Sequence, residues 1–313
     1  MRLLCLALSL LIALPALAAS PIPPAPRPLW KTDRPHKAVV VGGSISMYYA
    51  GNFGEYLQHG CRDLEVINRG KVGAGGPALA RIVRDDILGD PALTGPMRGG
   101  KGWILFQGGL NSVGSPESTA WFLSRLFLTA HEAGLQVVAL TLTPWGSDAD
   151  KRFDGWEGLR IQRATDHVSQ FILGRLTPAL AFGGRTQDRT VADGPWLPGE
   201  LPAIGVNVLQ SPLQAGKEAP LRPREPLLAG FAKGPFRKQV DKKDLLVAAA
   251  QAVPQRFMAR KYHDFDHVHP NGEGHRLMAA LVCQQAPAAW ACDCDAIRRA
   301  AWKGKVVAAK ATP

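Results

Sequence analysis

Residues able to do chemistry stand at four places in this 313-residue sequence, after predicted strands or before the last predicted helix. Three of these places hold Ser44, Gly73 and Asn111, and the fourth holds both Asp266 and His269. A serine hydroxyl becomes a nucleophile when a neighbouring histidine takes its proton, and a carboxylate can hold that histidine in the required tautomer. Amide donors can stabilise the oxyanion that forms on an attacked carbonyl group. These residue types therefore indicate nucleophilic catalysis.

Each of these residues also has an interpretation without chemistry. A serine after glycines is commonly a helix cap, a Gly-x-Asn sequence a turn, and an aspartate three residues before a histidine a surface turn. Asp264 and His267 have the same spacing as Asp266 and His269, so the sequence offers two registers for an Asp–His pair. Because Asn271 suits the N-cap of the last helix, the second register places His269 on the loop just before a rigid element, and we favour it.

Alternating strands and helices must position these residues. Strict alternation predicts parallel strand pairing with helices on both faces of the sheet. In open parallel sheets, ligands collect at the carboxyl ends of the strands, where the chemistry-bearing residues stand. The predicted strands cover residues 38–41, 64–67, 103–106, 137–140 and about 204–209. The predicted helices cover residues 45–57, 77–87, 118–133, 156–173 and 244–252, with a last helix after residue 271.

Four short blocks, in sequence order, resemble those of the SGNH, or GDSL-type, esterase and lipase superfamily. The blocks are Gly-Gly-Ser-Ile-Ser, Asn-Arg-Gly-Lys-Val-Gly, Gly-Leu-Asn and Asp-His-Val-His-Pro-Asn-Gly, and the resemblance spans roughly residues 37–280. It implies a three-layer α/β/α fold with a flavodoxin-like, parallel five-stranded sheet. It also implies a serine esterase that needs no metal or other cofactor.

The resemblance implies a role for each residue. Ser44 would be the nucleophile, His269 the general base, and Asp266 the carboxylate that orients the histidine. The backbone N–H groups of Ser44 and Gly73 and the side chain of Asn111 would form the oxyanion hole. The expected reaction is hydrolysis of a carboxylic ester through an acyl-serine intermediate.

Some positions depart from the family pattern or lie beside it. Gly43 stands where the family usually has an aspartate before the serine, and Ser112 where an aspartate usually follows the asparagine. Trp145, after the fourth strand, is a candidate wall of the acyl or leaving-group pocket, with a core or turn role as the alternative. We interpret the remaining histidines of the last block, at positions 263, 267 and 275, as surface or structural residues.

The N-terminal residues predict export. Arg2, an apolar run and an Ala-x-Ala end indicate a secretory signal cut after Ala18, with an uncleaved membrane anchor as the alternative. We therefore expect a periplasmic or extracellular protein. The expected organisation is a signal at 1–18, a Pro-rich leader at 19–36, the hydrolase domain at 37–295 with an insertion or lid at 211–261, and a basic tail at 296–313.

The cysteines agree with export. Without Cys5 of the signal, four remain, and an even number in an exported protein indicates disulfides. Cys292 and Cys294 are too close to pair with each other, so we expect Cys61 to pair with one of them and Cys283 with the other. A zinc site built from the three C-terminal cysteines and a nearby histidine is the alternative, but its spacing fits no usual ligand pattern.

Composition and charge limit the functional classes. Hydrophobic residues make up 46% of the chain, and no 18-residue apolar run follows the N-terminus, which excludes an integral membrane body. The net charge is +11, but the sequence contains no nucleic-acid-binding motif. We therefore expect the protein to lie near anionic envelope polymers or lipid head groups. The alternative is that the basic side chains are simply solvated.

The favoured substrate is an acetyl or short acyl ester on an envelope carbohydrate. The alternatives are a lipid esterase or an acyltransferase with the same triad, and a non-catalytic envelope-binding protein.

Overall fold

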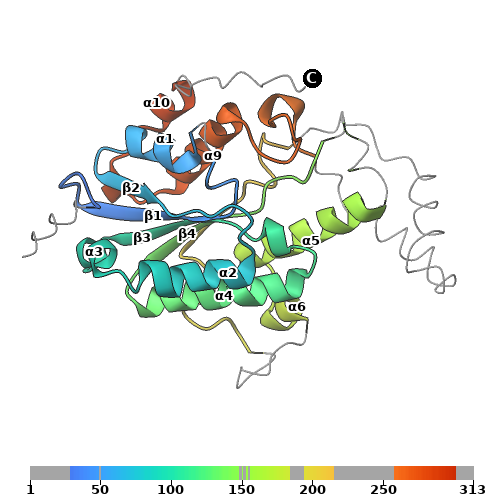
Figure 1. The fold of residues 1–313 in the computed structure, drawn as a ribbon, viewed down its shortest axis with the longest axis horizontal. Coiled ribbons are helices and arrows are strands. Elements are labelled where there is room, and N and C mark those ends of the chain that lie inside the picture. Colours follow the sequence, from blue (N-terminus) through green and yellow to red (C-terminus); the bar gives the residue numbers. More distant parts are fainter. Residues whose placement is uncertain are drawn as a thin grey trace, which may run out of the picture.

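The computed structural model describes residues 29–48, 51–147, 150, 153, 156–183, 194–214 and 257–300. Within them a five-stranded sheet lies between two layers of helices (Figure 1). The strand order is β2-β1-β3-β4-β5, and every neighbouring pair is parallel. This confirms the predicted three-layer α/β/α fold. The strands are β1 (His36–Gly42), β2 (Leu64–Asn68), β3 (Gly102–Gln107), β4 (Gln136–Leu140) and β5 (Ile204–Val206).

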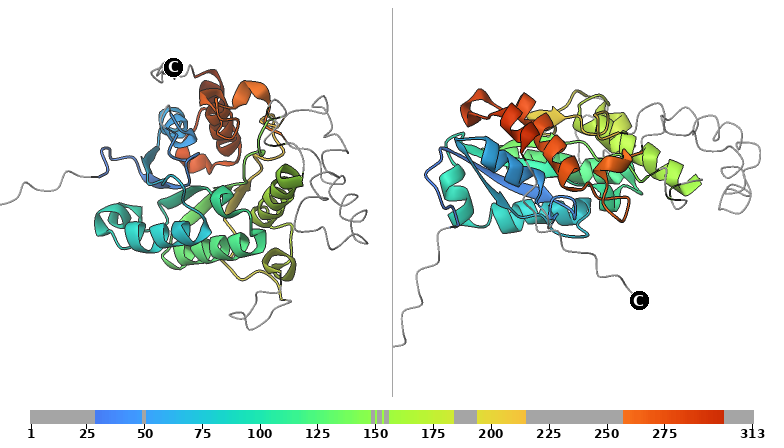
Figure 2. Two further views of the ribbon diagram at one scale, coloured as in Figure 1. Left: turned by 45° about the vertical axis from the view of Figure 1, so that its right-hand side comes forward. Right: turned by 90° about the horizontal axis from the view of Figure 1, so that it is seen from above.

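Helices cover both faces of the sheet, as the two further views show (Figure 2). On one face lie α1 (Phe53–Gly60), α9 (Gly272–Gln285) and α10 (Cys294–Arg299). On the other lie α2 (Gly76–Arg81), α4 (Pro116–Glu132), α5 (Trp156–Ile172) and α6 (Pro178–Phe182). Shorter elements are a π-helical turn at Ile82–Ile87, α3 (Pro91–Thr94), and 3-10 turns at Gly95–Met97, Leu110–Ser112, Arg260–Tyr262 and Ala288–Trp290.

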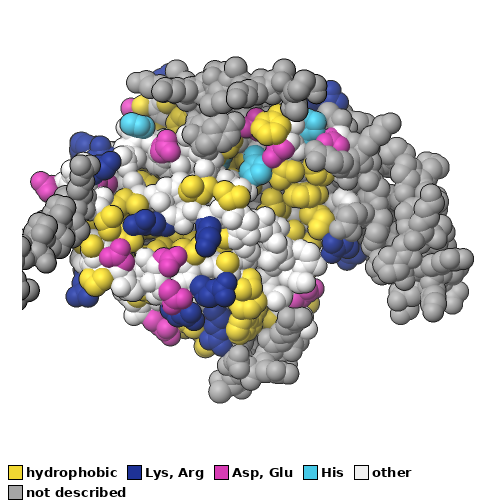
Figure 3. All heavy atoms as spheres, viewed as in Figure 1, with side chains coloured by type: hydrophobic (Ala, Val, Ile, Leu, Met, Phe, Trp, Pro, Cys, Tyr) yellow, Lys and Arg dark blue, Asp and Glu magenta, His cyan; other side chains and the backbone are white. Residues whose placement is uncertain are grey.

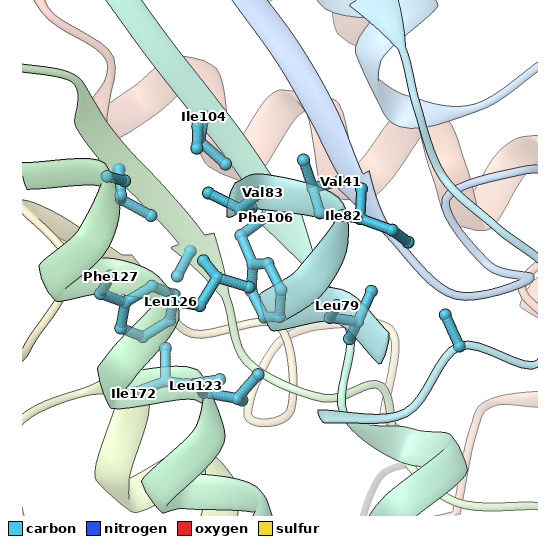
Figure 4. Packing of buried hydrophobic residues seen from close by; sticks show 14 of the residues in the cluster. Val41, Leu79, Ile82, Val83, Ile104, Phe106, Leu123, Leu126, Phe127 and Ile172 are labelled. Atoms are coloured by element: carbon cyan, nitrogen blue, oxygen red, sulfur yellow. The ribbon is translucent and has the colours of Figure 1, made fainter. Parts of the chain in front are cut away.

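The apolar runs of the strands are buried on both faces because successive side chains point to opposite sides of a sheet. In β1, Val39 and Val41 pack towards α2 and α4, while Ala38 and Val40 pack towards α1 and α9. Figure 4 shows the first of these clusters, in which Phe106 of β3 lies among aliphatic side chains of the helices. Two apolar layers therefore hold the sheet rigid beneath its carboxyl edge.

The structure shifts some predicted boundaries. The helix predicted from residue 45 begins at Phe53, because Asn52 caps it by accepting hydrogen bonds from the N–H groups of Gly54 and Glu55. Residues 44–47 form a turn instead. The last strand is short because the chain beyond Val206 leaves the sheet, and the N–H groups of residues 208 and 209 bond to the Thr141 hydroxyl.

Several predictions concern residues outside the described part of the chain. These are the signal at 1–18, most of the leader, the helix at 244–252 and most of the 211–261 insertion and the tail. From the leader, Trp30 is described: its side chain is buried and its indole N–H donates to the Leu93 carbonyl at 3.1 Å. None of the described helices is both long enough and apolar enough to cross a membrane.

The cysteines form two disulfides, in the predicted arrangement. Cys61 pairs with Cys292 and Cys283 with Cys294. The first bridge joins residues 231 positions apart and ties the end of α1 to the C-terminal segment, and the second joins α9 to α10. With their sulfurs in these bonds, the cysteines do not form the alternative zinc site.

Candidate active site

A pocket of about 140 Å³ opens at the carboxyl ends of β1 and β3. Its walls are the segments 43–45 and 107–111, together with Trp145, Val268 and His269. In this strand order the chain leaves β1 towards one side of the sheet, to β2, and leaves β3 towards the other, to β4. Open parallel sheets bind ligands at such a switch point, because the two departing connections leave a crevice. The fold thus places this pocket where a ligand is expected.

Ser44 is held at this crevice by a tight turn after β1. Gly42 allows the turn to pass over β3: a Cβ atom there would stand 1.8 Å from the Gln107 carbonyl oxygen. That oxygen instead accepts a hydrogen bond from the Ser46 hydroxyl at 2.9 Å. The Asn68 side chain, from the end of β2, donates to the Ser46 carbonyl at 2.7 Å. Contacts from both neighbouring strands therefore fix the turn that presents Ser44.

Ser44, His269 and Asp266 form a continuous chain of contacts. The Ser44 Oγ lies 2.6 Å from Nε2 of His269, although 225 residues separate the two in sequence. The other ring nitrogen, Nδ1, bonds to Oδ2 of Asp266. All three residues are half-buried. This is the geometry that lets a histidine take a proton from a serine while a carboxylate faces its far side.

The loop that carries Asp266 and His269 is held by its own hydrogen bonds. Oδ1 of Asp266 accepts from the backbone N–H groups of Val268 at 2.9 Å and His269 at 3.0 Å. Asn271 then caps α9 by accepting from the N–H of Gly274 at 3.0 Å, which confirms the predicted cap. The histidine therefore stands directly before a rigid helix.

These contacts keep Asp266 ionised. Burial disfavours the charged carboxylate, but hydrogen bonds from the His269 ring and from two backbone N–H groups outweigh burial and hold the pKa of Asp266 well below its usual range. A carboxylate that stays negative near neutral pH can stabilise a positively charged imidazolium.

The alternative pair, Asp264 with His267, is separated in the structure. The Asp264 carboxylate accepts a hydrogen bond from the Tyr48 hydroxyl at 2.8 Å. His267 has a φ of +64° and its Nδ1 lies 3.1 Å from Oδ2 of Asp150. Sequence reasoning missed both Tyr48 and Asp150, because they lie 216 and 117 residues from their partners and no local pattern connects them.

Of the two residues predicted to form the oxyanion hole with Ser44, one lines the pocket and the other lies beside it. Asn111 is exposed, lines the pocket with Ser44, and donates from Nδ2 to the Ala74 carbonyl at 3.2 Å. Gly73 precedes that alanine and has a φ of +75°, a conformation that glycine adopts without strain. It lies on the loop beside Asn111 and is not one of the residues that line the pocket.

The two departures from the family pattern have local consequences. A Cβ atom at Gly43 would stand 2.8 Å from Nδ2 of Asn111, so the glycine leaves room for the amide in its present position. The Ser112 hydroxyl oxygen accepts from the N–H of Gly76 at 2.9 Å, at the start of α2, and from the Thr119 hydroxyl at 3.0 Å. Ser112 therefore ties the segments after β2 and β3 together.

Two further aromatic side chains, Trp145 and His275, lie in or near the candidate active site. Trp145 lines the pocket and its ring lies edge-on to Phe153, with 5.4 Å between centroids. His275, in α9, is fully buried and stacks on Tyr48. Burial, with a smaller contribution from the charge of His269, lowers the pKa of His275 to about 3, so it stays neutral.

Comparison with known proteins gives structural similarities only. No family model and no curated protein matches the chain. Among solved structures, a putative acylhydrolase from Bacteroides fragilis is similar over 82% of this chain and 89% of its own, with 13% identity and a TM-score of 0.46. A GDSL-like lipase from Bacteroides thetaiotaomicron has the same coverage and identity and a TM-score of 0.45. An acetyl-xylooligosaccharide esterase from a Geobacillus species covers 80% of this chain and 93% of its own, with 13% identity and a TM-score of 0.44.

Proposed function

We propose that this chain is a serine esterase that hydrolyses carboxylic esters through an acyl-Ser44 intermediate. The observation that supports it is the 2.6 Å contact between Ser44 Oγ and His269 Nε2, backed by the ionised Asp266. The resemblance of the four sequence blocks to SGNH hydrolases points to the same chemistry.

The proposed reaction begins when Nε2 of His269 takes the Ser44 proton and Oγ attacks the ester carbonyl carbon. The carbonyl π electrons move to oxygen, and the negative charge of Asp266 stabilises the imidazolium. Collapse of the tetrahedral intermediate breaks the bond to the alcohol, which leaves with the proton from His269. Water then attacks the acyl-serine by the same steps, and releases the acid and free Ser44.

In the proposed reaction the oxyanion is stabilised by Asn111 Nδ2 and the backbone N–H of Ser44, which both line the pocket. The resemblance of the sequence blocks adds the backbone N–H of Gly73, on the adjoining loop. Preorganised donors of this kind act on charge that exists only in the transition state, so they lower the barrier without tightening substrate binding. The hydrogen bond from Asn111 to Ala74 and the room left by Gly43 both support this position of the amide.

Replacement of Asn111 tests this assignment. We expect Asn111→Ala to lower kcat by about 10²- to 10³-fold with little change in KM, because one oxyanion donor is lost. Steady-state kinetics on a nitrophenyl ester measures it. Ser112→Ala, which removes a neighbouring structural hydrogen bond, is the matched control. If kcat falls by the same small factor in both variants, Asn111 has no part in the oxyanion hole.

We further propose that the protein is exported and that its substrate carries an acetyl or other short acyl group on an envelope carbohydrate. The two disulfides support export, because such bonds persist in oxidising compartments. The pocket volume of about 140 Å³ supports a short acyl group, since cavities of about 150 Å³ hold a molecule the size of benzene.

A fluorophosphonate probe tests the proposed nucleophile directly. The probe reacts with an activated serine hydroxyl, so we expect mass spectrometry of the digested protein to find the adduct on Ser44. Denatured protein, in which the contact to His269 is lost, is the control and should remain unlabelled. An adduct on Ser46 or Ser112 instead of Ser44 would contradict the assignment.

A further inference from the structure

Three exposed hydrophobic side chains stand within three residues of Ser44, Gly73 or Asp266 in the sequence, although none of them lines the pocket. Among the described residues, five large hydrophobic side chains are exposed, and three of these are Met47, Val72 and Phe265. Met47 is three residues from Ser44, Val72 is next to Gly73, and Phe265 is next to Asp266. We call these three residues the apolar rim. On the face shown in Figure 3, hydrophobic side chains lie directly beside histidine and acidic side chains.

Contacts between the loops bring the rim residues to one edge of the sheet. Met47 lies against Gly70: a Cβ atom there would be 3.1 Å from Met47 Cγ, and Val72 follows two residues later. On the other side, Tyr48 is bonded to Asp264, the neighbour of Phe265. Met47 therefore belongs to the turn that presents Ser44, and Val72 and Phe265 lie on the loops that contact this turn or the residue after it.

Phe265 is exposed although its loop is held by hydrogen bonds. The Phe265 N–H donates to the Asp264 carboxylate at 2.8 Å, and the Asp264 N–H donates to the His269 carbonyl at 2.7 Å. These bonds hold the backbone N–H groups of residues 264 and 265, yet Phe265 is 82% exposed and Val72 is 70% exposed. Covering such an exposed apolar ring with another apolar surface is favourable, because it removes the ring from water.

Cations accompany the rim. Lys71, directly before Val72, is exposed and makes no ion pair within the described part of the chain. Lys261, on the segment that pairs with the catalytic loop through His263 and Pro270, is also exposed, and its Nζ lies 4.7 Å from the centroid of the Tyr262 ring. The acidic side chains of the catalytic loop are half-buried and bond to Tyr48 and His269. The loops that carry the apolar rim thus combine exposed apolar side chains with the positive charge of Lys71.

We propose that the apolar rim and Lys71 dock the protein on an anionic lipid surface and so hold the pocket close to acylated carbohydrate carried on that surface. Apolar side chains enter the acyl boundary of a bilayer while cations contact the head groups, and the net charge of +11 favours the same surface. The inference rests on the proposed function in one respect, that Ser44 is the reacting residue.

Vesicle binding tests the proposal without needing activity. Purified protein is sedimented with vesicles of phosphatidylcholine, or of phosphatidylcholine mixed with phosphatidylglycerol, and the bound fraction is measured. We expect binding to the anionic vesicles. Phe265→Ser should weaken it about tenfold, which corresponds to about 1.4 kcal/mol of lost burial. Lys71→Gln should weaken it about fivefold on anionic vesicles only, from about 1 kcal/mol per cation.

Matched controls lie at the other end of the molecule. Leu197 is 52% exposed and lies two residues before Gly199, which packs against His131 in the last turn of α4. Lys101 is exposed and precedes β3, at the amino edge of the sheet. We expect Leu197→Ser and Lys101→Gln to bind vesicles as the wild type does. Equal losses in the control and rim variants would overturn the proposal.

Two further outcomes would also overturn it. The wild type could fail to bind anionic vesicles, or it could form a dimer that Phe265→Ser dissociates, which would assign the rim to a second copy of the chain. Hydrolysis of a soluble nitrophenyl acetate separates this proposal from the proposed function. Phe265→Ser should hydrolyse that ester at the wild-type rate, and an inactive wild type would count against the esterase while leaving the vesicle result intact.

Discussion

Ser44→Ala is expected to lower kcat/KM for a carboxylic ester by about 10⁴- to 10⁶-fold. The alanine cannot form the acyl intermediate, and His269 then has no proton to take from the residue it contacts at 2.6 Å. The remaining activity would come from the oxyanion donors acting on water. Nitrophenyl acetate hydrolysis, followed at substrate concentrations well below KM, measures the ratio directly.

The control for this variant is Ser46→Ala. Ser46 lies two residues further along the same turn, is fully buried and donates its hydroxyl hydrogen to the Gln107 carbonyl. Its loss costs about 1 kcal/mol of stability and removes no reacting atom, so its kcat/KM should stay within about tenfold of the wild type, or about 1.4 kcal/mol. If the Ser44→Ala protein remained active, Ser44 would not be the nucleophile.

His269→Ala should be nearly as damaging, with a loss of about 10⁴- to 10⁶-fold in kcat/KM. The general base is lost, and Asp266 keeps its backbone hydrogen bonds but has no imidazolium to stabilise. Because residues of a triad act as one unit, the double variant Ser44→Ala/His269→Ala should be little worse than either single variant. A fully additive loss in the double variant would mean that the two residues act independently.

His267→Ala is the matched control for the histidine. His267 has the same spacing from Asp264 as His269 has from Asp266, but its ring contacts Asp150. We expect its replacement to weaken the attachment of the loop and to reduce kcat/KM by less than about tenfold, or about 1.4 kcal/mol. If His267→Ala were as inactive as Ser44→Ala while His269→Ala retained activity, the register of the catalytic pair would be wrong.

Much of the fold could be predicted because its signals are local. The run Ala38–Val41 is apolar over successive residues, as a strand buried on both faces requires, and it lies within β1. Asn271 precedes α9 and caps it within three residues. The helix predicted from residue 45 was placed too early. The turn that replaces its start is stabilised by the Gln107 carbonyl and the Asn68 side chain, which come from other strands.

The sequence by itself determined the residue types of the site and their order along the chain. Ser44, Asn111 and His269 each follow a strand or precede a helix, and those positions depend on hydrogen bonds and side-chain periodicity within a few residues. The tertiary structure decided which of them meet. The strand order places the ends of β1 and β3 side by side and brings His269 to Ser44 across 225 residues.

The same distinction explains what the sequence could not supply. Tyr48 meets Asp264, and Asp150 meets His267, only because the sheet and α9 fix the loops that carry them. The exposure of Phe265 likewise follows from hydrogen bonds that turn its polar neighbours inwards, and an isolated Asp-Phe-Asp sequence carries no sign of it. Spacing specifies contacts within about one turn of chain, whereas contacts between distant segments depend on packing that only the folded chain provides.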